Sequence, residues 1–110
     1  MLQIFDDPFS SEATDAWECL KRTRKRGDTV SGVVIQQKPF GVFLDAGIGF
    51  RVLLEVVQFR EAASEHFSVE DYPAVGSTVE GQLTVFTEHN RQVRVSQRFD
   101  ELENKLLRSG

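Results

Sequence analysis

Apolar and polar residues alternate along several short stretches of this chain, and this pattern predicts strands. Val30, Gly32 and Val34 share one parity, so they face the same side of a sheet. Val42 and Leu44 repeat the pattern further along. From such alternation, and from the turn residues between the stretches, we expect strands at about 29–36, 41–46, 50–54, 78–87 and 92–97.

A helical period precedes the first strand. The apolar residues Ala13, Ala16, Trp17 and Leu20 recur at the spacing of one helix face. Ser10 or Ser11 can cap the start of this helix, and the basic run at 21–26 would close its end, with Gly27 at the C′ position. We expect Trp17 to pack this amphipathic helix onto the strands. A sparser stripe predicts a short helix at 99–110, and the apolar leader before Ser10 should also pack somewhere on the protein.

The order of these elements indicates the fold class. Five short strands without a β-α-β rhythm, and with glycines at positions 32 and 81 where strands must coil, point to a small closed barrel. We therefore divide the chain into a leader and helix at 1–26, a barrel at 27–98 and a C-terminal helix at 99–110. The pattern breaks between 55 and 76, where 60–66 could form a short helix of its own.

Two aromatic residues stand out in the middle of the barrel. Phe43 has the opposite parity to Val42 and Leu44, so it is predicted to point away from the core. Phe40 precedes it by three positions. Such an outward aromatic pair is either covered by another part of the chain or exposed to contact a partner.

Composition narrows the range of functions. The 110 residues suit one domain, and the net charge is −4. Five of the 13 basic residues lie at 21–26, so the other positions carry 8 bases against 17 acids, a balance of −9. This acidity weakens a nucleic-acid role without excluding it, because phosphate binding depends on local potential. No apolar run is long enough to span a membrane. The acidic start and the single cysteine favour a cytoplasmic protein.

Catalytic and metal sites find little support. His66 and His89 are 23 positions apart, with no further ligand at a zinc-binding spacing. The Gly-x-Gly at 47–49 lacks the third glycine and the following helix of a phosphate loop, and it fits a hairpin turn. We therefore expect a protein that is not an enzyme and that needs no cofactor.

The motifs at 27–98 resemble a known family. They are G-x-x-V-x-G-x-V from Gly27, F-G-V-F-L-D from Phe40, a Leu-Leu pair, and V-x-V-S from Val93. This set is similar to the S-one domain, the RNA-binding OB-fold module of a bacterial small-subunit ribosomal protein. The resemblance implies a five-stranded OB-fold barrel flanked by helices. It also implies weakly sequence-selective binding of single-stranded RNA, in translation or RNA metabolism.

Residue by residue, the resemblance is partial. The family's two aromatics match Phe40 and Phe43, whereas its His is replaced by Glu55, its Asp falls near Thr87 and its Arg falls at Gln92. A weak RNA site would then comprise the aromatic pair and neighbouring polar or basic residues, namely Phe40, Phe43, Lys38, Arg51, Arg91, Gln92 and Arg94. The alternative is that the same face docks a protein partner, as an adaptor would.

Overall fold

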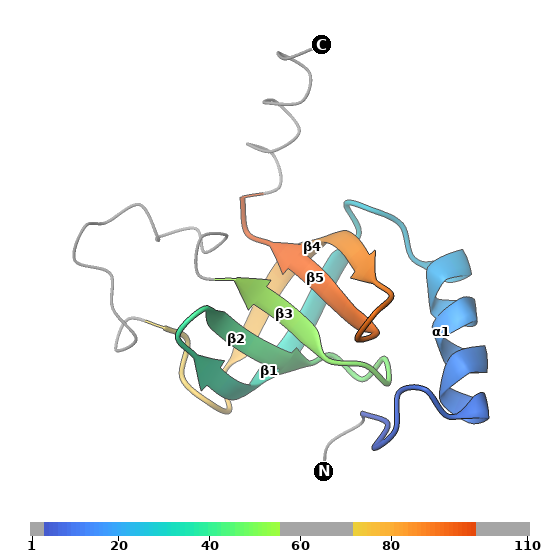
Figure 1. Ribbon diagram of the computed structural model, residues 1–110. Coiled ribbons are helices and arrows are strands. Elements are labelled where there is room, and N and C mark those ends of the chain that lie inside the picture. The colour runs from blue at the N-terminus through green and yellow to red at the C-terminus, as the bar shows by residue number, and fades with distance from the viewer. Residues whose placement is uncertain (1–3, 56–71, 99–110) are drawn as a thin grey trace.

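The computed structural model describes residues 4–55 and 72–98, which form a closed five-stranded barrel with one helix beside it (Figure 1). The predicted barrel is therefore confirmed. Its strands pair around the barrel in the order β1-β2-β3-β5-β4. The proposed helices at 60–66 and 99–110 lie outside the described residues. The elements are α1 (Ser11–Thr23), β1 (Thr29–Lys38), β2 (Gly41–Asp45), β3 (Val52–Glu55), β4 (Thr78–Thr87) and β5 (Gln92–Ser96).

Strand pairing and two glycines explain how so few strands close. β1 pairs antiparallel with both β2 and β4, and the parallel pair β3–β5 completes the circle. A Cβ added at Gly32 would lie 3.0 Å from the carbonyl oxygen of Asp45, and one at Gly81 would lie 3.1 Å from the Val95 side chain. These close approaches confirm that both glycines let neighbouring strands coil tightly.

The barrel interior holds the side chains that the alternating pattern assigned to it. Val34 is 1% exposed, and Val42 and Leu44 are fully buried. Their strand neighbours Leu54 and Val93 are also fully buried and belong to the same apolar cluster. Parity therefore predicted these core residues, but it fails at Val85 in β4, which is 46% exposed because the register shifts after Leu83.

Helix α1 packs on the barrel through Trp17. The Ser10 hydroxyl caps the helix by accepting a hydrogen bond from the Ala13 N–H at 3.1 Å. The Trp17 ring is fully buried, and its centroid lies 4.9 Å from that of Phe50 and 5.5 Å from that of Phe86, both in edge-to-face geometry. The predicted contact between helix and barrel is confirmed.

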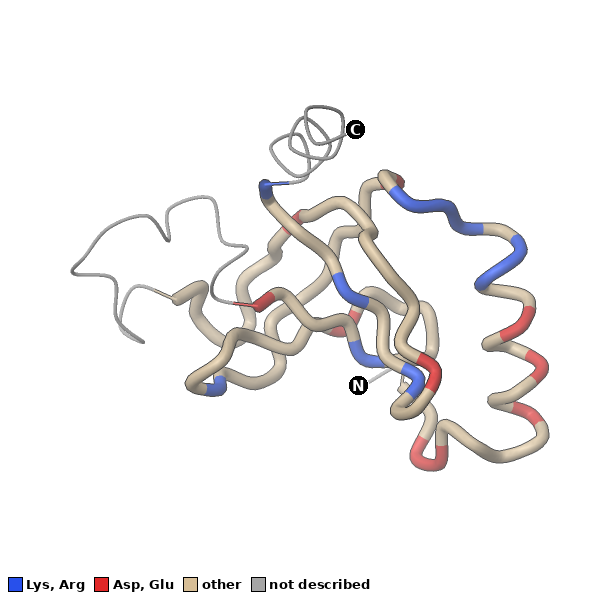
Figure 2. The backbone as a smooth tube through the Cα atoms, turned by 45° about the horizontal axis from the view of Figure 1, so that its top comes forward, with Lys and Arg blue, Asp and Glu red and all other residues tan. Residues whose placement is uncertain are grey.

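The helix ends earlier than predicted. It stops at Thr23, and Arg24 is already extended. Gly27 is therefore not the C′ residue. It occupies a separate turn at φ 96°, in which the Asp28 carboxylate accepts a hydrogen bond from the Lys25 N–H at 2.9 Å. This Asp28 turn competes with a further helical turn. Figure 2 shows the basic run as two blue stretches, interrupted at Thr23, where α1 ends, apart from the blue segments on the barrel.

The leader packs against two turns of the barrel. The Phe5 N–H donates to the carbonyl oxygen of Gly49 at 2.9 Å, and the Phe5 ring lies 5.5 Å from the Phe50 ring. The expectation that this apolar leader packs on the protein is confirmed at Phe5, whereas Phe9 is 52% exposed. No helix in the described ranges is long and apolar enough to cross a membrane.

Candidate nucleic-acid interface

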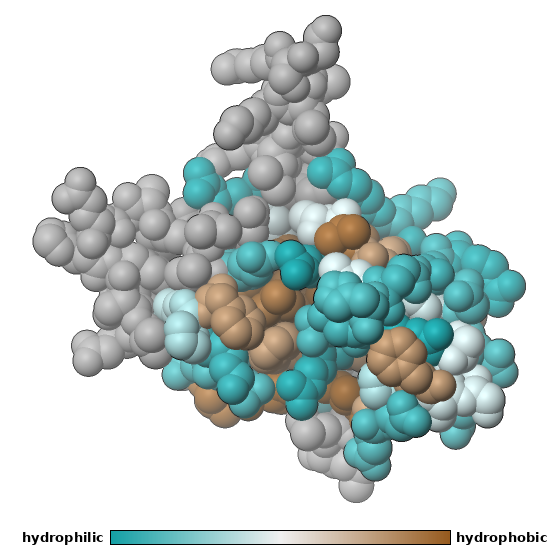
Figure 3. Space-filling view, viewed as in Figure 1, coloured by the Kyte–Doolittle hydropathy of each residue, from teal (hydrophilic) through white to brown (hydrophobic). Residues whose placement is uncertain are grey.

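The outer face of β2, β3 and β5 brings most of the predicted site together. In register, Phe43 lies opposite Leu53, and Leu53 lies opposite Arg94. These three side chains therefore form one row across three strands, on the side away from the core. In the space-filling view, apolar side chains gather over β2 and β3 and are bordered by hydrophilic ones (Figure 3).

The two predicted aromatics form a contacting pair. Their ring centroids are 5.9 Å apart in edge-to-face geometry, and Phe40 is 48% exposed. Phe40 lies in the turn between β1 and β2. This turn is anchored because the buried Tyr72 donates its hydroxyl hydrogen bond to the Pro39 carbonyl oxygen at 2.8 Å. Phe40 is thus an exposed ring on a supported turn.

Phe43 departs from the expectation of an open ring pair. It points away from the core, as its parity predicts, but it is only 6% exposed. The Arg51 guanidinium lies 5.4 Å from its ring centroid, and the edge-to-face Phe40 contacts it as well. These neighbours cover the ring. Phe43 is therefore the floor beneath Phe40 and Arg51, and a ligand would meet those two side chains first.

Two cations on this face keep their charge available. Arg51 is exposed immediately before β3, and Lys38 ends β1 beside the Phe40 turn. Within residues 4–55 and 72–98, no carboxylate is paired with either of them. Both can therefore contribute to phosphate binding without first breaking an ion pair.

Arg94 is already engaged. Its guanidinium donates to the Glu55 carboxylate at 2.8 Å, with both side chains about one-third exposed. Glu55 stands where the resembling family carries a histidine. The pair neutralises both charges, so Arg94 would meet an anionic ligand only after its contact with Glu55 opens.

Arg91 has a structural role that its sequence position did not reveal. It donates to the Pro8 carbonyl oxygen at 2.9 Å and to the Thr14 hydroxyl at 2.6 Å, and its guanidinium lies 4.6 Å from the Phe9 ring. Arg91 therefore ties the leader and the start of α1 to the turn between β4 and β5. Its neighbour Gln92 opens β5 next to this turn.

The same turn is clamped to the helix by Glu88. The Glu88 carboxylate accepts hydrogen bonds from Lys21 at 2.7 Å and from the Trp17 indole at 2.8 Å. The hydrogen bond from Lys21, followed by that from Trp17, lowers the pKa of Glu88 below its usual value. The hydrogen bond to Glu88 in turn raises the pKa of Lys21. Both groups are therefore charged at neutral pH, and the clamp is intact there.

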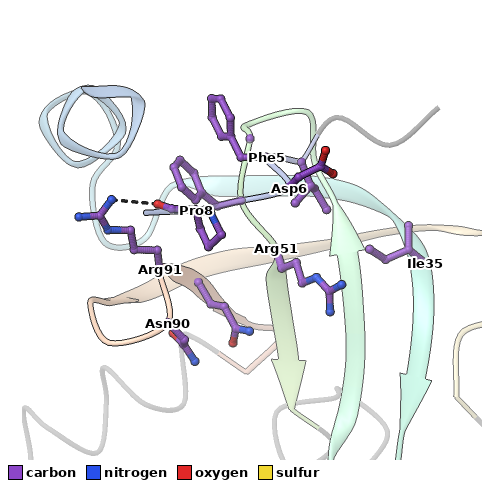
Figure 4. A pocket seen from close by; sticks show the side chains of 11 residues that line it. Phe5, Asp6, Pro8, Ile35, Arg51, Asn90 and Arg91 are labelled. Carbon is purple, nitrogen blue, oxygen red and sulfur yellow. Dashed lines mark hydrogen bonds between the residues drawn. The ribbon is translucent and has the colours of Figure 1, made fainter. Parts of the chain in front are cut away.

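A cavity of about 420 Å³ lies beside this face, and the sequence did not predict it (Figure 4). The leader lies along one side of the cavity, and the turns that carry Arg51 and Arg91 lie along the other. The only feature of the sequence that pointed toward this cavity was the apolar character of the leader. Chain order could not show that this leader crosses the barrel end.

Comparisons with known proteins agree on the fold. No protein-family model matches the chain, and no curated protein is significantly similar to it in sequence. Among solved structures, GSP13 from Bacillus subtilis aligns at 16% identity with a TM-score of 0.56, over 72% of this chain and 59% of that one. The chain therefore spans less than two-thirds of that relative.

Two further solved structures align with this chain at similar identities and TM-scores. An uncharacterized protein from Methanocaldococcus jannaschii aligns at 19% identity with a TM-score of 0.54, over 66% of this chain and 90% of that one. A chain in the a/eIF2alpha–aDim2p–rRNA complex from Pyrococcus horikoshii aligns at 18% identity with a TM-score of 0.54, over 76% of this chain and 54% of that one. The chain has an OB fold. At these identities the likeness concerns architecture, and it supports the sequence resemblance at that level.

Proposed function

We propose that this protein is a binding module, not an enzyme, that binds single-stranded RNA weakly across the outer face of β2, β3 and β5. The observation that carries the proposal is the arrangement of Phe40, Phe43 and Arg51, in which an exposed ring and a guanidinium lie together over a buried aromatic floor. A nucleobase can stack on the Phe40 ring or on the guanidinium plane, while Arg51 and Lys38 meet the phosphates.

The architecture supports this choice of face. OB folds bind oligonucleotides on the surface of strands 2 and 3, between the loop that joins strands 1 and 2 and the loop that joins strands 4 and 5. Phe40 lies in the first of these loops and Arg91 in the second. One of the similar structures is of a complex that contains rRNA. Stacking accepts any base, so we expect little sequence selectivity from this face.

Phe40→Ala should weaken binding to a labelled oligouridine by about tenfold, because one stacked base contributes roughly 1–3 kcal/mol. Fluorescence anisotropy at low salt measures this. Phe9→Ala is a matched control, since Phe9 is similarly exposed, at 52%, but lies on the leader. Equal affinity of the two variants for the oligonucleotide would contradict the proposed site.

A folded protein that binds no oligonucleotide at low salt would instead favour the protein-docking adaptor, for which Phe40 would be the exposed anchor.

Glu55→Gln should tighten RNA binding, because it releases the charge of Arg94. For single strands, each phosphate contact adds about −0.7 to the slope of log affinity against log salt. Lys38 and Arg51 alone predict a slope of about −1.4, and a freed Arg94 should bring it to about −2.1. Titrations at several salt concentrations measure the slope. An unchanged slope would mean that Arg94 does not meet the phosphates, and Glu80→Gln controls for the change in net charge.

A further inference from the structure

We infer that the cavity between the leader and the barrel is a nucleobase pocket that adds one base-selective position to the proposed RNA face. This inference rests on the proposed function, because the strand that crosses the face must also deliver the base. The cavity volume of about 420 Å³ falls within the range typical of small-molecule sites, roughly 300–1,000 Å³. Its lining combines apolar and polar side chains, as such sites require.

The apolar wall comes from residues that are far apart in sequence. Phe5 from the leader, Ile35 from the irregular part of β1 and Phe50 from the turn before β3 all line the cavity. Phe50 is almost fully buried, whereas Phe5 and Ile35 are partly exposed. An apolar surface of this kind suits the flat face of a base.

The polar wall can read the edge of a base. Asn90 and Gln92 line the cavity from the β4–β5 turn and the start of β5. The Asn90 side-chain oxygen accepts a hydrogen bond from Thr87 at 2.6 Å, and no acceptor among residues 4–55 and 72–98 engages its amide hydrogens. In the described part of the chain, no hydrogen bond engages the Gln92 amide. Side-chain amides both donate and accept, so they can discriminate between the edges of different bases.

Arg51 connects the cavity to the stacking face. Its guanidinium lies over Phe43, and the same residue lines the cavity. A strand that stacks on Phe40 and passes Arg51 would therefore reach the cavity without leaving the surface. Asp6 also lines the cavity, and Figure 4 shows it on the leader side with Phe5, across from Arg51. The negative charge of Asp6 disfavours a phosphate on the leader side, whereas Arg51 and Arg91 line the opposite side, so the phosphate would stay near the arginines and the base would face the leader.

The position of the leader depends on a close contact. A Cβ added at Gly49 would lie 2.8 Å from the edge of the Phe5 ring, so only glycine admits the ring at this place. The Phe5 N–H bond to the Gly49 carbonyl oxygen and the bonds from Arg91 to Pro8 and Thr14 hold the leader at two points. The wall is therefore part of the folded structure.

The test compares oligouridine, oligocytidine and oligoadenosine of equal length, at one low salt concentration, on the 110-residue chain. The wild type should prefer one base by about fivefold, since a discriminating contact of about 1 kcal/mol is typical of one hydrogen bond. Gln92→Ala should reduce this preference to less than twofold. Phe5→Ala should weaken the preferred oligonucleotide by about five- to tenfold.

The outcomes separate this inference from the proposed function. If Phe40→Ala weakens binding while Phe5→Ala and Gln92→Ala both match the wild type, the pocket is overturned and the RNA face remains. If the folded wild type binds none of the oligonucleotides, both are overturned. Phe5→Ala could weaken binding only because it loosens the leader. Gln92→Ala avoids this problem, because no hydrogen bond within the described residues depends on the Gln92 side chain, so its loss should leave the fold intact.

Discussion

Trp17→Ala should lower the free energy of unfolding by about 3–5 kcal/mol, the range usual for removal of a buried large aromatic side chain. Trp17 is fully buried, and its ring contacts Phe50 and Phe86, so its loss leaves a cavity between α1 and the barrel. Its indole also donates to Glu88. Urea unfolding followed by circular dichroism measures the change, because the substitution removes the protein's single tryptophan fluorophore.

Trp17→Phe is the smaller change at this position. It keeps a six-membered aromatic ring against Phe50 and removes the pyrrole part of the indole together with its N–H, so it should cost less than Trp17→Ala by at least 1 kcal/mol. If Trp17→Ala left the urea midpoint unchanged, the helix would contribute nothing to the stability of the barrel, and the packing described above would be wrong.

Gly41→Ala should destabilise the protein by about 2–4 kcal/mol, because β2 and β3 approach each other too closely there for any side chain. An added Cβ would overlap the carbonyl oxygen of Leu54 and lie 2.8 Å from the Glu55 Cα. The φ of Gly41, +153°, is also one that side chains rarely adopt. The backbone of β3 would have to move, and it carries Leu53 and Glu55 on the candidate face.

Gly76→Ala is the matched control for this effect. Gly76 has a φ of +93°, but an added Cβ there would have no neighbour within 4 Å. Its cost should be limited to conformational strain, about 1 kcal/mol. Equal urea midpoints for the two variants would show that backbone conformation, and not the contact with β3, makes Gly41 necessary. Gly41→Ala should also weaken oligonucleotide binding more than Gly76→Ala does.

The elements of the fold followed from local patterns because each depends on residues near in sequence. Alternation placed every strand end to within two residues, and the spacing of Ala13, Trp17 and Leu20 placed the helix. The end of α1 was wrong, since the Asp28 turn that follows the helix was not recognised in the basic run. The resemblance to the S-one domain predicted the barrel correctly for the same reason. The glycines and apolar positions of the motif are ones that strand geometry requires.

The sequence by itself determined the closed barrel, its core, the helix that Trp17 anchors and the outward direction of Phe43. Only the tertiary structure decided how open each candidate side chain is. It covers Phe43 with Arg51, pairs Arg94 with Glu55, and places Phe5 across the barrel end to wall a cavity. Parity shows on which side of a strand a residue lies. Its exposure and its ion pairs depend on which other segments of the chain pack on that side. Local sequence patterns do not show which segments those are.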